Sequence, residues 1–227
     1  MKKIFKNWTK FEIIFSLIFI CVILCGYFLG AGRNLLSLIV SLLGVISVIT
    51  VAKGLVIAPF ISIVFNILYS ILAITQKYYG EAIINFCILI PLCIAQIISW
   101  LKNRNAKNTD IVKVNKITSK EYLLLFFMGI GFTILFYFIL KALNTNHLIV
   151  STSSLMMSFI ASYLSVRRSP YYAIFFMIDD IVGFTLWLLA VVTFNPTLIP
   201  SLLCPLLFLF IDLYGFIRWK KDEKNAI

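Results

Sequence analysis

Long apolar runs separated by short polar breaks dominate the pattern along the chain. Each run is close to the ~20 residues that cross a bilayer as one helix. The pattern predicts eight such helices, at residues 11–30, 34–52, 55–75, 80–101, 121–143, 148–166, 171–192 and 197–217. We therefore expect an all-α membrane protein embedded in a lipid bilayer.

Composition supports this class and excludes several others. The chain is 62% hydrophobic and 13% charged, whereas soluble domains are roughly half apolar and a quarter charged. The five cysteines lie inside apolar runs without a CxxC spacing, and His147 is the single histidine, so we expect no metal site and no cofactor. Motifs of phosphate-binding loops, serine hydrolases and zinc proteases do not occur in the sequence, which argues against an enzyme.

The basic residues fall almost entirely on one side of this topology. Of the 20 Lys and Arg residues, only Arg33, Lys77 and Lys141 lie in connections on the other side. Because cytoplasmic loops carry an excess of Lys and Arg, the pattern predicts that both termini and the 102–120 loop are cytoplasmic. Topology therefore explains the net charge of +11, and we expect no nucleic-acid partner.

The polar 102–120 loop divides the chain into two halves of four predicted helices each. Thr118 and Glu121 have the spacing of a capping box for the helix that follows the loop. Gln96-Ile-Ile-Ser-Trp100 near the end of the first half has a weak counterpart in Gly215-Phe-Ile-Arg-Trp219 near the end of the second. The alternative explanation is that both Trp side chains belong to the aromatic belt at the membrane surface.

If this similarity marks a repeat, the chain has a 3+1+3 plan of parallel repeats, a plan known from small transporters. The first predicted helix is then an extra one. The predicted segments are 1–33 (N-terminal tail and extra helix), 34–101 (first three-helix repeat), 102–147 (basic loop and linker helix) and 148–227 (second repeat and basic tail).

Two adjacent carboxylates, Asp179 and Asp180, interrupt the run at 171–192. At 1.5 Å per residue they lie ~12–14 Å deep, near the membrane midplane, where an Asp facing lipid costs ~2.5–3.5 kcal/mol. Asp180 shares one helix stripe with Gly183 and Trp187, which predicts a cavity wall. Asp179 faces a neighbouring helix or the rim of the same cavity, and we expect an interhelical hydrogen bond to Ser or Tyr.

Other polar residues have spacings that place them on single helix faces. Amides, an acid and aromatic rings spread over both halves favour a binding cavity for a planar, polar small molecule. We expect Pro91 to disturb its helix, Asp212 to lie towards a cytoplasmic helix end, and Tyr78-Tyr79-Gly80-Glu81 to be an interfacial turn. The other polar candidates are Asn66 and Tyr69, Asn85 and Gln96, and Ser158, Ser162 and Tyr163.

Two stretches carry a family resemblance. They read FNILYSILAITQKYYGEAIINFCILIPLCIAQIISW and SFIASYLSVRRSPYYAIFFMIDDIVGF, and they resemble the PnuC family of nicotinamide riboside transporters. The resemblance implies a 3+1+3 fold related to the SWEET sugar transporters and a homotrimer. It also implies facilitated uptake of a vitamin-like nucleoside, which a cytoplasmic kinase then traps by phosphorylation.

The resemblance also implies positions for the binding residues. Asp180 falls where relatives usually have Asn, and Ala173 and Phe176 match a Trp-x-x-Trp pair that stacks on the substrate ring. A cationic ring, as in nicotinamide riboside or thiamin, would gain from Asp180 as a counter-charge. The predicted substrate-binding residues are Asn66, Tyr69, Asn85, Gln96, Tyr163, Phe176, Asp180 and Trp187.

Two other functions remain open from sequence. One is a substrate-binding subunit of an ATP-driven vitamin uptake complex. The other is an intramembrane aspartyl protease using Asp180 and Asp212, although neither has the expected motif and Asp212 is predicted to lie several turns nearer the surface. No ion-coordinating cluster accompanies the acids, which favours transport without a coupling ion.

Overall fold

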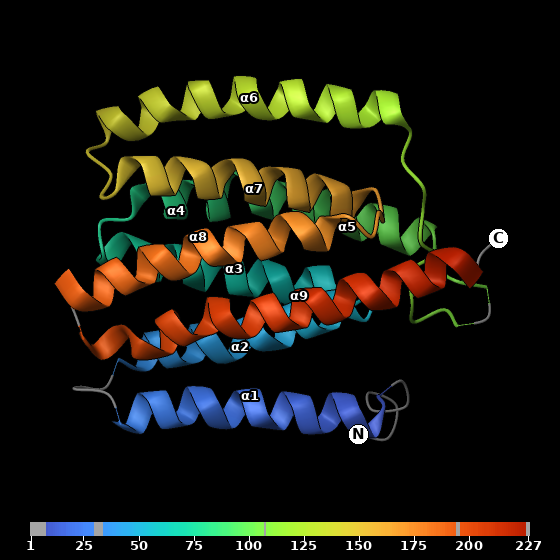
Figure 1. Ribbon diagram of the computed structural model, residues 1–227, viewed down its shortest axis with the longest axis horizontal. Coiled ribbons are helices and arrows are strands. Elements are labelled where there is room, and N and C mark those ends of the chain that lie inside the picture. Colours follow the sequence, from blue (N-terminus) through green and yellow to red (C-terminus); the bar gives the residue numbers. More distant parts are fainter. Residues whose placement is uncertain (1–7, 30–33, 107, 194–195, 226–227) are drawn as a thin grey trace.

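A bundle of long helices makes up the computed structural model, which describes residues 8–29, 34–106, 108–193 and 196–225 (Figure 1). Its helices are α1 (Lys10–Leu29), α2 (Leu35–Ala52), α3 (Ala58–Thr75), α4 (Tyr79–Ile83), η2 (Ile84–Leu89), α5 (Ile90–Lys102), α6 (Ser119–Ala142), α7 (Leu148–Val166), α8 (Tyr172–Thr193), η3 (Pro196–Leu198) and α9 (Ile199–Asn225). Helices α4, η2 and α5 follow one another as one span. The predicted all-α architecture and the predicted order of its helices are therefore confirmed.

Seven helices in the described residues are long and apolar enough to cross a membrane, and the apolar part of α1, Glu12–Phe28, is shorter. The predicted boundaries agree within a few residues except at the end of the chain. The prediction ended the last helix at 217, but α9 continues to Asn225. Its polar end remains helical, so Asp212 lies about halfway along α9 instead of near its end.

The chain ends described here and the loop between α5 and α6 lie at the same end of the bundle (Figure 1). We call this the basic end, because Lys53, Arg167 and Arg218 also lie there. This arrangement agrees with the charge pattern of the sequence. Five of the basic residues that entered this charge pattern lie outside the described residues. They are Lys2, Lys3, Lys6, Arg33 and Lys107.

Helices α1 and α6 lie on opposite flanks of the bundle (Figure 1). Helix α6 packs on α7, and α1 packs on α2 and α9. Large apolar side chains such as Phe127 and Phe138 of α6 are 62% exposed, which suits contact with lipid tails. The other six spans enclose the centre of the protein.

The span from α4 to α5 contains a six-residue π-helix, Ile84–Leu89, which ends two residues before Pro91. Pro91 has no N–H to donate within a regular helix, and a widened π turn accommodates such an interruption, often at functional sites. The predicted disturbance by Pro91 is therefore confirmed. It places Asn85 in the widened turn.

The predicted capping box at Thr118 and Glu121 is wrong. Helix α6 does begin after Thr118, but the Thr118 side chain makes no capping hydrogen bond. Glu121 instead accepts hydrogen bonds from Arg167 Nε at 2.5 Å and Tyr163 Oη at 3.0 Å. The Glu121 carboxylate thus bonds to the charged Arg167 instead of to a backbone N–H at the helix start. This hydrogen bond raises the pKa of Arg167 above its ordinary value.

A buried ion network joins α1 to the basic end. The Glu12 carboxylate accepts from Lys53 Nζ at 2.6 Å, Arg218 Nη1 at 2.5 Å and Tyr214 Oη at 2.6 Å. Glu12 and Lys53 are 2% and 1% exposed, and the Lys53 ammonium lies 4.4 Å from the centroid of the Trp8 ring. The network fastens the N-terminal helix to the end of α2 and to α9.

Trp100 and Trp219 are not residues of an exposed aromatic belt. Both are buried, and their ring centroids are 5.7 Å apart. Trp100 Nε1 donates to the Ser165 carbonyl and Trp219 Nε1 to the Ala52 carbonyl, each at 3.0 Å. The last helix of each half therefore bonds to the end of the first core helix of the other half.

Helix α2 approaches its neighbours closely at Gly44. A Cβ there would lie 2.6 Å from Phe208 Cζ and 2.9 Å from Phe65 Cε2. We expect Gly44→Ala to lower the free energy of unfolding by about 1–3 kcal/mol, since the rings must shift. Gly131→Ala is the matched control, because an added Cβ there meets nothing within 4 Å. Within a helix, Ala is more stable than Gly by up to ~1 kcal/mol. Thermal unfolding in one detergent compares them, and equal midpoints would refute the crowding.

Candidate substrate cavity

A cavity of about 160 Å³ lies at the centre of the bundle. Side chains from α2, α3, α4, η2 and α5 of the first half line it together with side chains from α7, α8 and α9 of the second. Among the described residues, none of α1 or α6 contributes to the lining. The site therefore belongs to the six core spans and not to the extra helix or the linker helix.

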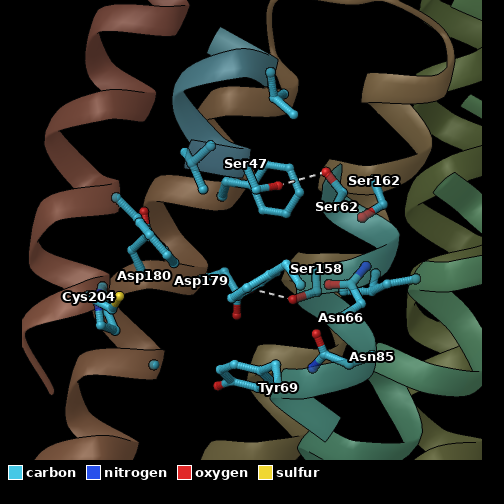
Figure 2. A pocket seen from close by; sticks show the side chains of 18 of the residues that line it. Ser47, Ser62, Asn66, Tyr69, Asn85, Ser158, Ser162, Asp179, Asp180 and Cys204 are labelled. Atoms are coloured by element: carbon cyan, nitrogen blue, oxygen red, sulfur yellow. Dashed lines mark hydrogen bonds between the residues drawn. The ribbon is translucent and has the colours of Figure 1, made fainter. Parts of the chain in front are cut away.

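Asp179 projects into the cavity from α8 towards α7 (Figure 2). Ser154 Oγ donates to Asp179 Oδ1 at 2.7 Å, and Ser158 Oγ donates to Asp179 Oδ2. The predicted interhelical hydrogen bond to Ser is therefore confirmed. These two hydroxyls fix the Asp179 carboxyl group as part of the wall between α7 and α8.

Asp180, Gly183 and Trp187 all line the cavity, as their shared helix stripe predicted. Asp212 of α9 lines the same cavity as Asp180. The prediction that Asp212 lies several turns nearer the surface is therefore wrong, because α9 extends beyond its predicted end and Asp212 is at its middle. Asp180 Oδ2 and Asp212 Oδ1 have no hydrogen-bond partner in the described part of the chain.

Glu81 is a cavity residue that the sequence interpretation missed. It was assigned to an interfacial turn, but it is 5% exposed and lines the cavity, and Tyr69 Oη lies 3.4 Å from its Oε2. The available signal was its spacing, since residues four apart in a helix share a face and Asn85 follows four residues later. The short α4 turns Glu81 inward.

The three predicted amides come together at the cavity from different positions along the chain (Figure 2 labels two of them). Asn66 Nδ2 lies 3.6 Å from Cys93 Sγ, and Asn85 Nδ2 donates to the Glu81 carbonyl at 2.7 Å. Gln96 Nε2 donates to Ser165 Oγ at 2.9 Å. Each amide group is held in place by the protein.

The predicted aromatic residues divide into two groups. Tyr69, Phe176 and Trp187 line the cavity, whereas Tyr163 does not appear in its lining. Tyr163 instead bonds to Glu121 near the basic end, because its ring follows Ser162 around the helix and points away from the cavity. Ala173, the other position of the expected aromatic pair, is buried.

Buried aromatic residues flank the cavity at both ends. Towards the end opposite the basic one, Trp187 Nε1 donates to Tyr69 Oη at 3.0 Å, and Tyr78 Oη donates to the Leu186 carbonyl at 3.2 Å. Burial raises the pKa of Tyr78 to about 12, so this phenol stays a donor. Towards the basic end, the Trp100–Trp219 pair fills the corresponding position.

The charges of the cavity have one sign. Glu81, Asp179, Asp180 and Asp212 line it, and the described lining residues include no Lys, Arg or His. Like charges in a desolvated cavity repel strongly. The arrangement suits a polar ligand that carries positive charge and disfavours an anion.

A polar, charged cavity enclosed by six membrane spans and flanked by aromatic layers defines a multi-pass transporter of small molecules. A family model described as "Nicotinamide mononucleotide transporter" matches residues 34–221. The chain belongs to this family, which is a transporter family and not an enzyme family, and the resemblance noted from sequence is confirmed.

A curated relative and a solved structure agree with this assignment. The chain is 24% identical over 227 residues to the "Nicotinamide riboside transporter PnuC" of Neisseria mucosa, covering 99% of this chain and 86% of the relative. It is also similar to the "Crystal structure of the Vitamin B3 transporter PnuC", with a TM-score of 0.85, 23% identity, and coverage of 96% of this chain and 94% of that one. The structural match confirms the fold.

Proposed function

We propose that this protein transports nicotinamide riboside, or a closely related cationic B vitamin, into the cell by facilitated diffusion. The observation that carries the proposal is the cavity charge: four carboxyl groups line it, and its described lining has no cationic side chain. Nicotinamide riboside carries a positive ring and no phosphate. The relative from Neisseria mucosa is named for the same compound.

The same charges favour the nucleoside over its mononucleotide. A phosphate group brings negative charge close to Asp179, Asp180 and Glu81, and such like-charge contacts cost several kcal/mol. The family model is named for the mononucleotide, so this distinction rests on the cavity of this chain. A cytoplasmic kinase would then trap the product, because the phosphorylated form fits the cavity poorly.

We place the ligand between the two halves of the cavity. The amides of Asn66, Asn85 and Gln96 offer hydrogen bonds to the ribose and carboxamide, while Phe176 offers a ring face for stacking. Asp180 supplies the counter-charge to the cationic ring. Asp179 is already occupied by two Ser hydroxyls and serves as wall structure.

Release of the ligand requires movement of the two halves. The cavity of about 160 Å³ is smaller than the ~300–1,000 Å³ of typical ligand sites, and aromatic layers flank it at both ends. We propose that the units 34–101 and 148–227 rock against each other to open one end at a time. The family match begins at residue 34, where the first of these units begins, and so leaves out the extra N-terminal helix.

The orientation and assembly are also proposals. The basic end, which holds both described chain ends (Figure 1), faces the cytoplasm under the positive-inside rule. A homotrimer follows from the family resemblance. Mass photometry of the purified protein gives the oligomer, and labelling of single Cys variants at the two ends gives the orientation.

Calorimetry on the purified protein tests the cargo. We expect nicotinamide riboside to bind, the mononucleotide to bind at least about 100-fold more weakly, and Asp180→Asn to reduce the affinity for nicotinamide riboside by about 10–100-fold through loss of the counter-charge. Asp222→Asn is the matched control, since Asp222 is exposed in the described tail. Equal binding of a neutral nucleoside, or an unchanged Asp180→Asn variant, would refute the cationic site.

Uptake into liposomes separates facilitated diffusion from an ATP-driven complex. We expect the purified chain to equilibrate labelled nicotinamide riboside without ATP or a second protein. Counterflow, in which unlabelled vitamin inside accelerates entry of the label, identifies a carrier. A chain that binds but never transports would instead be a substrate-binding subunit.

A further inference from the structure

Glu81 is a buried acid of the cavity wall with an unused carboxyl oxygen. It lies in the first turn of α4, it is 5% exposed, and it lines the cavity. Its Oε1 atom has no hydrogen-bond partner in the described part of the chain. Because a buried polar atom without a partner costs free energy, a ligand that donates a hydrogen bond to this oxygen is favoured.

The donors that the protein itself places near Glu81 are committed elsewhere. The Ser154 hydroxyl lies beside Glu81, but a hydroxyl has a single proton, and Ser154 donates it to Asp179 Oδ1 at 2.7 Å. The Tyr69 hydroxyl faces the other carboxyl oxygen, Oε2, at a long 3.4 Å. Trp187 Nε1 donates to Tyr69 Oη at 3.0 Å and holds this phenol in place. Oε1 of Glu81 therefore stays available to a ligand.

Glu81 belongs to the end of the cavity that lies opposite the basic end. Tyr69 bonds to its carboxyl group, and Asn85 bonds to its backbone carbonyl. Figure 2 shows these two partners at the bottom of the labelled group, and Ser47, which lies near the basic end of α2, at its top. The label of Asp180 lies between them (Figure 2). Glu81 and the residues near the basic end therefore contact different parts of a ligand.

The proposed cargo fits this order with its ring towards the basic end. Phe176, the residue that offers a face for stacking, lies in the second turn of α8, which begins at the basic end, and Asp180 follows one turn later. Gln96 lies six residues before the basic end of α5. With the ring beside these residues, the ribose extends from the charged ring nitrogen towards Glu81.

A carboxyl oxygen is a suitable acceptor for ribose hydroxyls. In dinucleotide-binding domains an Asp or Glu accepts from the 2′-hydroxyl of the ribose in this way. A site built to bond a hydroxyl rejects an analogue that lacks it, because the buried acceptor is then left unpaired. An analogue without the 2′ and 3′ hydroxyls leaves Oε1 of Glu81 in that state.

We propose that Glu81 is a specificity-determining residue of this transporter, whose Oε1 atom accepts a hydrogen bond from the 2′ or 3′ hydroxyl of a riboside cargo. This inference rests on the proposed function, and it narrows the cargo to a riboside. Asp180 faces the charge of the ring and Glu81 faces the sugar, so the two acids select different parts of the cargo. The protein then favours the riboside over the free vitamin base and over deoxy analogues.

Calorimetry with two matched ligands tests this role. The probes are nicotinamide riboside and its 2′,3′-dideoxy analogue, which have the same ring and the same charge. We expect the unmodified protein to bind the riboside about 10–100-fold more tightly than the analogue. Glu81→Met keeps a side chain of similar length without the carboxyl group. It should reduce this preference to about threefold or less, mainly by weakening the binding of the riboside.

Asp180→Asn is the matched control in the same cavity. It should weaken the binding of both ligands by a similar factor, because both carry the ring charge, and the ratio of their affinities should stay unchanged. Glu81→Ala is a second variant in case Glu81→Met does not fold, since it removes the carboxyl group without adding bulk. Both Glu81 variants are expected to lose the same preference.

Each outcome decides the role of Glu81 separately from the cargo. Equal affinities of the unmodified protein for the two ligands, or an unchanged ratio in the Glu81 variants, overturn that role and leave the cationic cargo standing. If neither nicotinamide ligand binds, the proposed cargo fails, and inosine with its 2′,3′-dideoxy analogue replaces the pair. A preference for inosine that disappears in Glu81→Met then supports recognition of the ribose, and equal binding or no binding of these two overturns it.

Discussion

Replacing Glu12 by Gln is expected to lower the free energy of unfolding by about 3–5 kcal/mol, the cost of leaving a buried charge without its partner. Glu12 is the shared acceptor of Lys53 and Arg218. Burial lowers the pKa of Lys53 below its ordinary value, and the hydrogen bond to Glu12 opposes that shift. Without the carboxylate, the ammonium of Lys53 keeps the cost of burial and loses the compensation.

Unfolding of the purified variant in a fixed detergent measures this effect. Glu223→Gln is the matched control, because the Lys220–Glu223 pair at 2.8 Å is partly exposed and such pairs contribute roughly 0–1 kcal/mol. The double variant Glu12→Gln/Lys53→Met should recover part of the loss, since the orphaned ammonium is gone. If Glu12→Gln unfolds at the same midpoint as Glu223→Gln, the network does not hold α1 in place.

Truncating Trp219 or Trp100 to Ala is expected to cost about 3–5 kcal/mol each, the usual range for a buried Trp. Both are nearly fully buried at 2% and 0% exposure, and each indole N–H bonds to a helix-end carbonyl of the other half. Because the two rings contact each other, the double variant should lose less than the two single losses combined.

Conservative variants separate packing from hydrogen bonding. Trp219→Phe keeps most of the ring and loses the bond to the Ala52 carbonyl, for which we expect a loss of about 1–3 kcal/mol. Trp187→Phe, whose indole bonds to Tyr69 Oη at 3.0 Å, applies the same change at the opposite end of the cavity. Additive losses for Trp100→Ala and Trp219→Ala would contradict a direct contact between the halves at the basic end.

The candidate site was only partly predictable, and particular residues show why. Spacing within one helix correctly placed Asp180, Gly183 and Trp187 in the cavity, and Asn85 with Gln96. Spacing could not predict that Asp180 and Asp212 line the same cavity, which depends on how far α9 extends and on its packing along α8. Nor could it show that Tyr163 bonds to Glu121 instead of lining the cavity.

The sequence by itself determined the membrane class, the order and approximate ends of the helices, and the family. These follow from local patterns, because a span must be apolar over its whole length and basic residues cluster on one side. Only the tertiary structure decided that Glu81 lines the cavity, that Trp100 meets Trp219, and that Asp212 lines the same cavity as Asp180. These contacts join residues of different helices, and their geometry depends on helix packing, which no single segment encodes.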